Sequence, residues 1–208
     1  MTASAENRTR RLLTIGHSNH PIKKFLRLLS ASGIELLVDV RSQPFSKYAR
    51  QFDASELNRA VTSSGIKYLF LGEELGGRPR PLDFYDREGH VLYGLVAESP
   101  LFLQGIQRLK SDVMKHQVAI MCSEEDPKDC HRRLLIGRVL SKDGILVSHI
   151  RGEGHIQTEE QLAQEKATGQ AGGLQLTMVE LAEEEMWRSV KPIRSVSRSD
   201  AQRTSSKP

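Results

Sequence analysis

The residues with the most chemical potential lie in the segment CSEEDPKDCHRR, positions 122–133. The thiol sulfurs of Cys122 and Cys130 and the imidazole of His131 are donors that zinc or iron ions accept. A cysteine at a helix N-terminus beside a histidine favours its thiolate, so Cys130 is the stronger candidate for a reactive thiol and Cys122 for a buried apolar residue. Arg132 and the N-terminus of the same helix could instead hold a phosphate. Metal, thiol and phosphate chemistry all remain open from this segment alone.

Further polar and small residues follow other short apolar segments, and we group them into one candidate site. The catalytic candidates are His17, Asp39, Cys122, Glu124 and His131, and the substrate-binding candidates are Ser18, Arg41, Cys130, Arg132, Gly76 and Gly77. We expect His131 and Glu124 to act as general acid and base, and the arginines to hold an anion. A divalent metal cofactor is left open, because the spacing C-x7-C-H is not a recognised zinc-finger pattern.

The candidate site residues can lie close together if the segments before them are parallel strands, because the carboxyl ends of such strands lie at the same edge of a sheet. Short apolar segments alternate with segments of helical apolar spacing, which predicts that arrangement. The predicted strands are residues 12–16, 34–40, 66–71, 117–122 and 145–150. Helices are predicted between them, one of them opened by a capping box of Asp53 and Glu56. The expected fold is α/β: a single domain with a mostly parallel, helix-flanked, Rossmann-like sheet and a C-terminal helical extension.

The chain divides by composition into four parts. Residues 1–11 are expected to be a flexible N-terminus without a signal peptide, 12–150 the α/β domain, 151–187 a helical extension with a helix at 176–187, and 188–208 a disordered basic tail. Within the domain, the Gly/Pro-rich residues 72–90 predict a long loop. The tail carries most of the positive charge behind the formal net charge of +4, so a basic folded surface is not implied. With 2 cysteines and no long apolar segment, we expect a cytoplasmic protein without a membrane span.

Five short motifs occur in order along the predicted domain: TIGHS at 14–18, DVRSQP at 39–44, LGG at 75–77, CSE at 122–124 and CHR at 130–132. Together they resemble the family named domain of unknown function 488, over residues 12–150. The resemblance implies a cytoplasmic α/β domain with its site at the strand ends. It brings no established activity, so the chemistry has to be argued from the residues.

Three functions compete at this stage. The leading one is an enzyme that acts on a phosphate-bearing substrate, a nucleotide or a nucleic acid, at the carboxyl edge of the sheet. The loop SEEDPKD opposes it, since its four carboxylates repel a phosphate unless a cation intervenes. The second is a metal-dependent or thiol-dependent enzyme that uses Cys122, Cys130 and His131. The third is a non-catalytic nucleic-acid-binding module that uses the basic tail, although aromatic residues make up only 5 % of the chain and no interleaved basic–aromatic strand is found.

Overall fold

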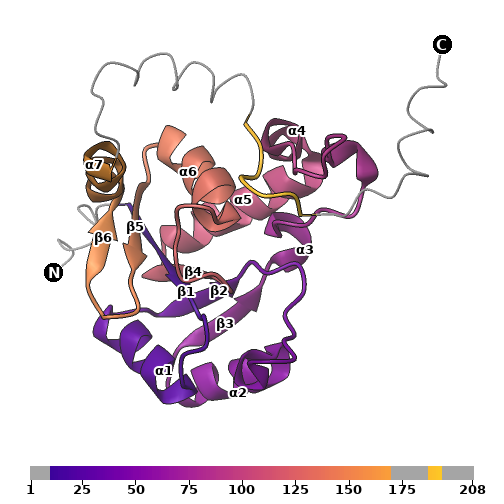
Figure 1. Ribbon diagram of the computed structural model, residues 1–208. Coiled ribbons are helices and arrows are strands. Elements are labelled where there is room, and N and C mark those ends of the chain that lie inside the picture. Colours follow the sequence, from indigo (N-terminus) through magenta and orange to yellow (C-terminus); the bar gives the residue numbers. More distant parts are fainter. Residues whose placement is uncertain (1–9, 170–186, 194–208) are drawn as a thin grey trace, which may run out of the picture.

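The structure, a computed structural model, describes residues 10–169 and 187–193 (Figure 1). Within these residues, six strands form one sheet in the order β3-β2-β4-β1-β5-β6. Their bounds are β1 Arg11–Gly16, β2 Leu36–Asp39, β3 Lys67–Phe70, β4 Val118–Cys122, β5 Leu146–Ile150 and β6 Ile156–Thr158. Neighbouring strands are parallel except β5 and β6, which are antiparallel. The predicted α/β fold with a mostly parallel, Rossmann-like sheet is confirmed.

Helices cover both faces of this sheet (Figure 1). α1 (Ile22–Ala31) and α2 (Ala54–Ser63) lie on one face, and α5 (Pro100–Val113) and α6 (Arg138–Lys142) lie on the other. The short helices α3 (Gly72–Leu75) and α4 (Tyr93–Glu98) pack against α5, and α7 (Glu159–Gly169) packs beside β6. A π-helix at Arg132–Gly137 leads into α6, and 3-10 helices occupy Arg50–Phe52 and Leu82–Phe84.

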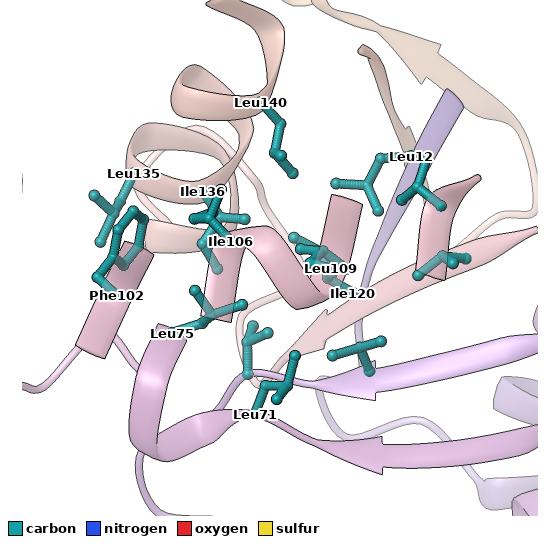
Figure 2. Packing of buried hydrophobic residues seen from close by; sticks show 14 of the residues in the cluster. Leu12, Leu71, Leu75, Phe102, Ile106, Leu109, Ile120, Leu135, Ile136 and Leu140 are labelled. Atoms are coloured by element: carbon teal, nitrogen blue, oxygen red, sulfur yellow. The ribbon is translucent and has the colours of Figure 1, made fainter. Parts of the chain in front are cut away.

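The central strands are apolar on both sides because each side faces a layer of helices. Leu12 of β1 and Ile120 of β4 point toward the α5 face, where they join a cluster with Phe102 (Figure 2). The alternate residues Leu13 and Ile15 of β1 point the other way, into the cluster under α1 and α2. Two-sided burial explains why these strands are nearly continuous apolar segments in the sequence.

Two local predictions need correction, and one strand was missed. Asp53 does precede α2, but its side chain makes no capping bond to the helix and instead accepts a hydrogen bond from the backbone N–H of Ser46 over 2.8 Å. Residues 72–90 are not a structureless loop, because they contain α3, a 3-10 helix and Tyr85, which forms a bridge to Val91. The antiparallel strand β6 was not predicted, since three residues of mixed polarity give too weak a pattern.

The C-terminal part of the chain is described at residues 187–193. There Trp187 packs edge-on against Tyr93 and donates its Nε1–H to the carbonyl of Leu134 over 2.8 Å. The backbone N–H groups of Ser189 and Ile193 donate to the carbonyls of Val91 and Gly89 over 2.9 Å each, so residues 188–193, which we expected in the tail, belong to the packed structure. Residues 194–208 and nearly all of the helix expected at 176–187 lie outside the described residues. None of the described helices combines the length and apolar character needed to cross a membrane.

Candidate functional site

The carboxyl ends of β1 and β4 meet where the direction of the chain connections reverses. After β1 the chain runs through α1 to β2 on one side, and after β4 it runs through α6 to β5 on the other. Open parallel sheets bind their ligands at such a switch point. His17 directly follows β1, and its backbone N–H donates to the carbonyl of Cys122 at the end of β4 over 3.0 Å. The two strand ends thus bring the predicted site residues of both segments together.

Cys122, Cys130 and His131 form a compact buried cluster beyond β4. The Nδ1 atom of His131 lies 3.8 Å from the Sγ atom of Cys122 and 3.8 Å from the Sγ atom of Cys130. All three donor atoms lie within 4.8 Å of one another. The loop at residues 123–129 returns the chain to the end of β4, so the following helical segment starts beside Cys122. Two soft sulfur donors and one imidazole nitrogen are the donor set of a zinc or iron site.

The imidazole ring of His131 is fixed from two sides. Its Nε2 atom lies 3.0 Å from the carbonyl oxygen of Val40, which can only accept, so Nε2 carries the hydrogen and Nδ1 faces the sulfurs. On the other side, a Cβ atom at Gly77 would lie 2.7 Å from Cγ and Nδ1 of the ring. Gly76 in turn leaves room for the side chain of Ser42. Both glycines, which we predicted to bind substrate, are required here for close packing.

The cluster also sets which thiol ionises first. The hydrogen bond from the Cys130 thiol, helped by the charge of His131 and opposed by burial, holds the pKa of Cys122 well below its usual value. Burial and the neighbouring Cys122 thiolate raise the pKa of Cys130. Burial lowers the pKa of His131, but the charge of Cys122 outweighs it and the net direction is upward. These contacts favour Cys122 as the thiolate, in contrast to the preference for Cys130 expected from the sequence.

Arg132 is almost fully buried, and its guanidinium bonds groups inside the protein. Nε donates to the hydroxyl of Thr14 over 3.1 Å, and one terminal nitrogen donates to the carbonyl of Glu125 over 2.6 Å. The other terminal nitrogen donates to the carbonyl of Glu124. Gly16 gives this carbonyl the space it needs, since a Cβ there would collide with it. Arg132 thus holds the loop at residues 123–129 against β1, which favours a structural role over the predicted contact with a substrate anion.

Asp39 and Arg41 form a second buried network at the end of β2. Two guanidinium nitrogens of Arg41 donate to the two carboxylate oxygens of Asp39 over 2.6 and 2.9 Å, and the Tyr68 hydroxyl donates to the same carboxylate over 2.8 Å. A third nitrogen of Arg41 lies 3.2 Å from Nε2 of His17, whose Nδ1 donates to the carbonyl of Ser18 over 2.7 Å. Burial, more than any other influence, lowers the pKa of His17, so its ring is neutral in this network. Arg41 is satisfied by partners within the protein.

Ser18 and Glu124 lie at the surface of the site. Ser18 has a φ of 44°, and no other non-glycine residue in the described part of the chain has a positive φ. Such strain is concentrated at functional positions. The backbone N–H of Ser18 donates to the carbonyl of Ser123 over 2.9 Å, so the strained turn abuts the loop after β4. The Glu124 carboxylate is exposed, and its charge contributes to the raised pKa of His131.

Four residues of this region were not among the predicted site residues. The Thr14 hydroxyl, which accepts from Arg132, lies 2.8 Å from Nδ1 of His149, and Nε2 of His149 lies 2.8 Å from the carboxylate of Glu159. Tyr93 is the fourth: burial, followed by the charges of Cys130, Glu124 and Cys122, raises the pKa of its hydroxyl. Its position after the Gly/Pro-rich segment carries no strand-end signal. Only the fold brings it into the electric field of the cysteines.

A second group in the described residues also has the donor types of a metal site. It consists of Asp86, Glu88 and His90. A terminal nitrogen of Arg188 lies 2.5 Å from the Asp86 carboxylate and 3.2 Å from that of Glu88. The guanidinium thus already supplies the positive charge that these carboxylates need. This group is therefore a weaker metal candidate than the one around His131.

Comparison with known proteins gives one family match. A family model described as "Domain of unknown function DUF488" matches residues 21–139. The matched segment contains β2, β3, β4 and every predicted site residue except His17 and Ser18. No curated protein and no solved structure matches the chain.

Proposed function

Because the chain belongs to the DUF488 family, whose description names no activity, we propose its function from the site itself: a metal-dependent enzyme whose ion is bound by Cys122, Cys130 and His131. One observation carries the proposal, the position of Nδ1 of His131 at 3.8 Å from both sulfurs. Tetrahedral ligands at usual zinc–sulfur and zinc–nitrogen distances are about 3.6 Å apart. The cluster therefore needs only a small contraction to bind zinc or ferrous iron.

The number of ligands favours a catalytic over a purely structural ion. Structural zinc sites have four protein ligands, whereas catalytic sites have three and keep a position for water or substrate. In the described part of the chain, no fourth His, Cys, Asp or Glu belongs to this group. A bound ion would lower the pKa of a coordinated water and polarise a substrate oxygen.

The proposed substrate carries a phosphate, as in a nucleotide or a nucleic acid. Arg41 and Arg132 are buried among partners of their own, which leaves the ion as the better electrophile for a phosphate oxygen. The ion also answers the objection from the acidic loop, since a cation between the loop and the phosphate removes the repulsion. The exposed Glu124 carboxylate is then a candidate base for a metal-bound water. Reduced thiols are needed for this centre, so the proposal includes a cytoplasmic location.

Metal content of the full chain tests the centre directly. The protein is purified without a metal-binding tag or chelator, its zinc and iron are measured, and Co²⁺ is titrated into the metal-free protein. We expect close to one ion per chain and a thiolate-to-cobalt absorption band. Cys122→Ser, Cys130→Ser and His131→Ala should each remove both signals. His155→Ala, which changes an exposed histidine, is the matched control and should keep them.

The same experiment decides the competing thiol function. That alternative is favoured by one observation, the position of the Cys122 sulfur beside the Cys130 thiol and 3.8 Å from Nδ1 of His131, two groups that stabilise a thiolate. If the protein binds no ion and shows no cobalt band, the metal proposal is wrong. Alkylation of Cys122 with iodoacetamide in wild type and in Cys130→Ser then measures its reactivity as a nucleophile.

A further inference from the structure

The loop between β2 and α2 exposes the two most accessible aromatic side chains of the protein. Phe45 is 73 % exposed and Tyr48 is 93 % exposed. The chain has 6 Phe, 4 Tyr and 1 Trp, all within the described residues, and the other nine are buried or half-buried. Exposed aromatic rings are unfavourable in water, and a pair of them in one short loop marks a contact surface.

The loop is held in a defined shape while these two rings point outward. The Ser46 hydroxyl accepts from the backbone N–H groups of Tyr48 and Ala49 over 3.2 and 3.1 Å. The Asp53 carboxylate accepts from the backbone N–H of Ser46 over 2.8 Å. Pro44, directly before Phe45, and Ala49, directly after Tyr48, are both buried. Phe45 and Tyr48 are therefore exposed on a loop of fixed shape. Their rings can stack with a ligand without a rearrangement of the loop.

Positive charge is interleaved with the rings. Lys47 lies between Phe45 and Tyr48 in the sequence, Arg50 follows, and both are exposed. Arg78 is also exposed, and its backbone N–H donates to the hydroxyl of Ser42 over 2.9 Å, which places it next to the same loop.

The acidic side chains near the loop do not pair with its cations. Within the described residues, none of Lys47, Arg50 and Arg78 forms an ion pair, and the Asp53 carboxylate is engaged by the loop backbone. Glu73, the nearest exposed acid on α3, lies 3.9 Å from Arg80 instead. The local net charge is therefore positive, although the folded body as a whole is not basic.

We propose that this aromatic–basic loop (residues 42–50, with Arg78) binds single-stranded nucleic acid. Unpaired bases would stack on Phe45 and Tyr48, and the backbone phosphates would contact Lys47, Arg50 and Arg78. Alternating cations and aromatic rings match a strand in which charge and base alternate, whereas a duplex keeps its bases stacked inside and offers no ring face. The pattern occurs in a loop, whereas the sequence was expected to show it, if at all, in a strand. The proposal stands on the loop alone and does not depend on a metal ion.

The loop also adjoins the cluster around His131. Ser42 contacts Gly76 and Arg78, and the next residue between them, Gly77, lies against the His131 ring. A nucleic acid bound on the loop would therefore lie close to the candidate metal centre.

Binding of a fluorescein-labelled oligothymidine of about 12 nucleotides, followed by fluorescence anisotropy on the full chain, tests the proposal. We expect Phe45→Ala and Tyr48→Ala to weaken binding by at least about 5-fold each, while Tyr48→Phe keeps it. Lys47→Ala and Arg50→Ala should weaken binding and reduce the salt slope by about 0.7 each. These residues are exposed, so melting temperatures should not change.

Three controls make the result decisive. Leu101→Ala removes an exposed apolar side chain on α5 and should leave affinity unchanged. A variant with the tail cations changed to glutamine, at Arg194, Arg198, Arg203 and Lys207, separates charge in the tail from binding by the loop. Heparin and duplex DNA serve as competitors that offer charge without unpaired bases. The proposal is overturned if oligothymidine does not bind, if both alanine variants bind like wild type, or if the competitors displace it as well as unlabelled single strands.

These outcomes are separate from those of the metal experiment. The loop variants leave Cys122, Cys130 and His131 in place, and metal content is measured on the same samples. If the loop variants lose oligothymidine binding but keep their full metal content, the loop proposal is supported independently of the metal centre. If His131→Ala still binds oligothymidine, the loop binds nucleic acid without the ion. Unchanged binding in the loop variants refutes the loop proposal whether or not a metal is found.

Discussion

The carbonyl oxygen of Val40 lies 3.0 Å from Nε2 of His131, although the two residues are 91 positions apart in the sequence. Val40 directly follows β2, so this bond fixes the ring relative to the sheet. A hydrogen bond at one nitrogen orients a histidine and raises the basicity of the other nitrogen. The Nδ1 atom therefore faces both sulfurs before any ligand arrives, and a metal ion would meet an ordered donor.

Gly77→Ala tests whether the position of this ring matters. A Cβ at residue 77 would lie 2.7 Å from two ring atoms of His131, one of them Nδ1, so the ring must leave the position in which Nδ1 faces the sulfurs. We expect metal affinity to fall by about 10- to 100-fold, the usual effect of disturbing a group that positions a ligand. Competition with a chromophoric chelator measures the change.

Gly94→Ala is the matched control for that variant. A Cβ at Gly94 would have only one neighbour, a ring carbon of Trp187 at 4.0 Å, so alanine fits there without displacement. Because alanine is the better helix former, α4 should become slightly more stable and metal affinity should not change. If both variants bind metal like wild type, the close packing of Gly77 has no role in the centre.

Asp39→Asn tests the buried network at the end of β2. The variant keeps the shape of the side chain but leaves the Arg41 guanidinium buried without its counter-charge. Removal of one partner of a buried ion pair costs about 3–5 kcal/mol of unfolding free energy. Urea unfolding measures the loss, and Glu56→Gln, which breaks the exposed pair with Arg59, should be close to wild type. Equal stability of the two variants would mean that the Asp39 pair contributes no more than a surface pair.

The elements could be predicted from the sequence, but the partners within the site could not. Residues 12–16 and 117–122 are apolar because both faces of β1 and β4 are covered, and the edge rule then places His17 beside Cys122. The carbonyls of Val40 and Glu125, however, carry no sequence signal, since every residue has one. The orientation of His131 depends on the first of these carbonyls, and the role of Arg132 depends on the second and on that of Glu124. The preference for one thiolate over the other depends on a hydrogen bond between the two thiols and on the charge of His131 beside Cys122, and both contacts exist only in the folded chain.

We expect the folded chain to lose stability in acid, because the pKa values of His149 and Glu159 are lowered in the folded state. Burial is the main reason that the pKa of His149 lies below its ordinary value of 6.5. As the pH falls through 6.5, the unfolded chain takes up the proton first, so stability is complete above this pH and declines below it. The pKa of Glu159 is also low: burial raises it, but the hydrogen bond from His149 and the charge of Arg133 outweigh this effect. Its contribution is lost at still lower pH, below the ordinary value of 4.5.

His149→Gln measures the first of these losses. The free energy of unfolding, obtained from urea titrations between about pH 7.5 and pH 5, should fall less steeply in the variant than in wild type, by at most about 1.4 kcal/mol per pH unit. The slope will not vanish, because burial also lowers the pKa of His17. His155→Gln changes an exposed histidine and should follow the wild-type curve. Parallel curves for wild type and His149→Gln would show that His149 titrates alike in the folded and unfolded chains.

Arg132→Lys distinguishes the two roles considered for that arginine. The guanidinium donates to the Thr14 hydroxyl and to the carbonyls of Glu124 and Glu125, and a lysine ammonium cannot reproduce this planar set of donors. A structural role predicts a loss of about 3 kcal/mol in urea unfolding, because buried acceptors lose their donors. An anion-binding role instead predicts near-normal stability and weaker binding of inorganic phosphate, with a difference that shrinks as salt is added. Arg27→Lys, at an exposed position of α1, should change neither quantity. Since the guanidinium is 1 % exposed, we expect the stability loss, and a stable variant with salt-sensitive phosphate binding would restore Arg132 to the substrate site.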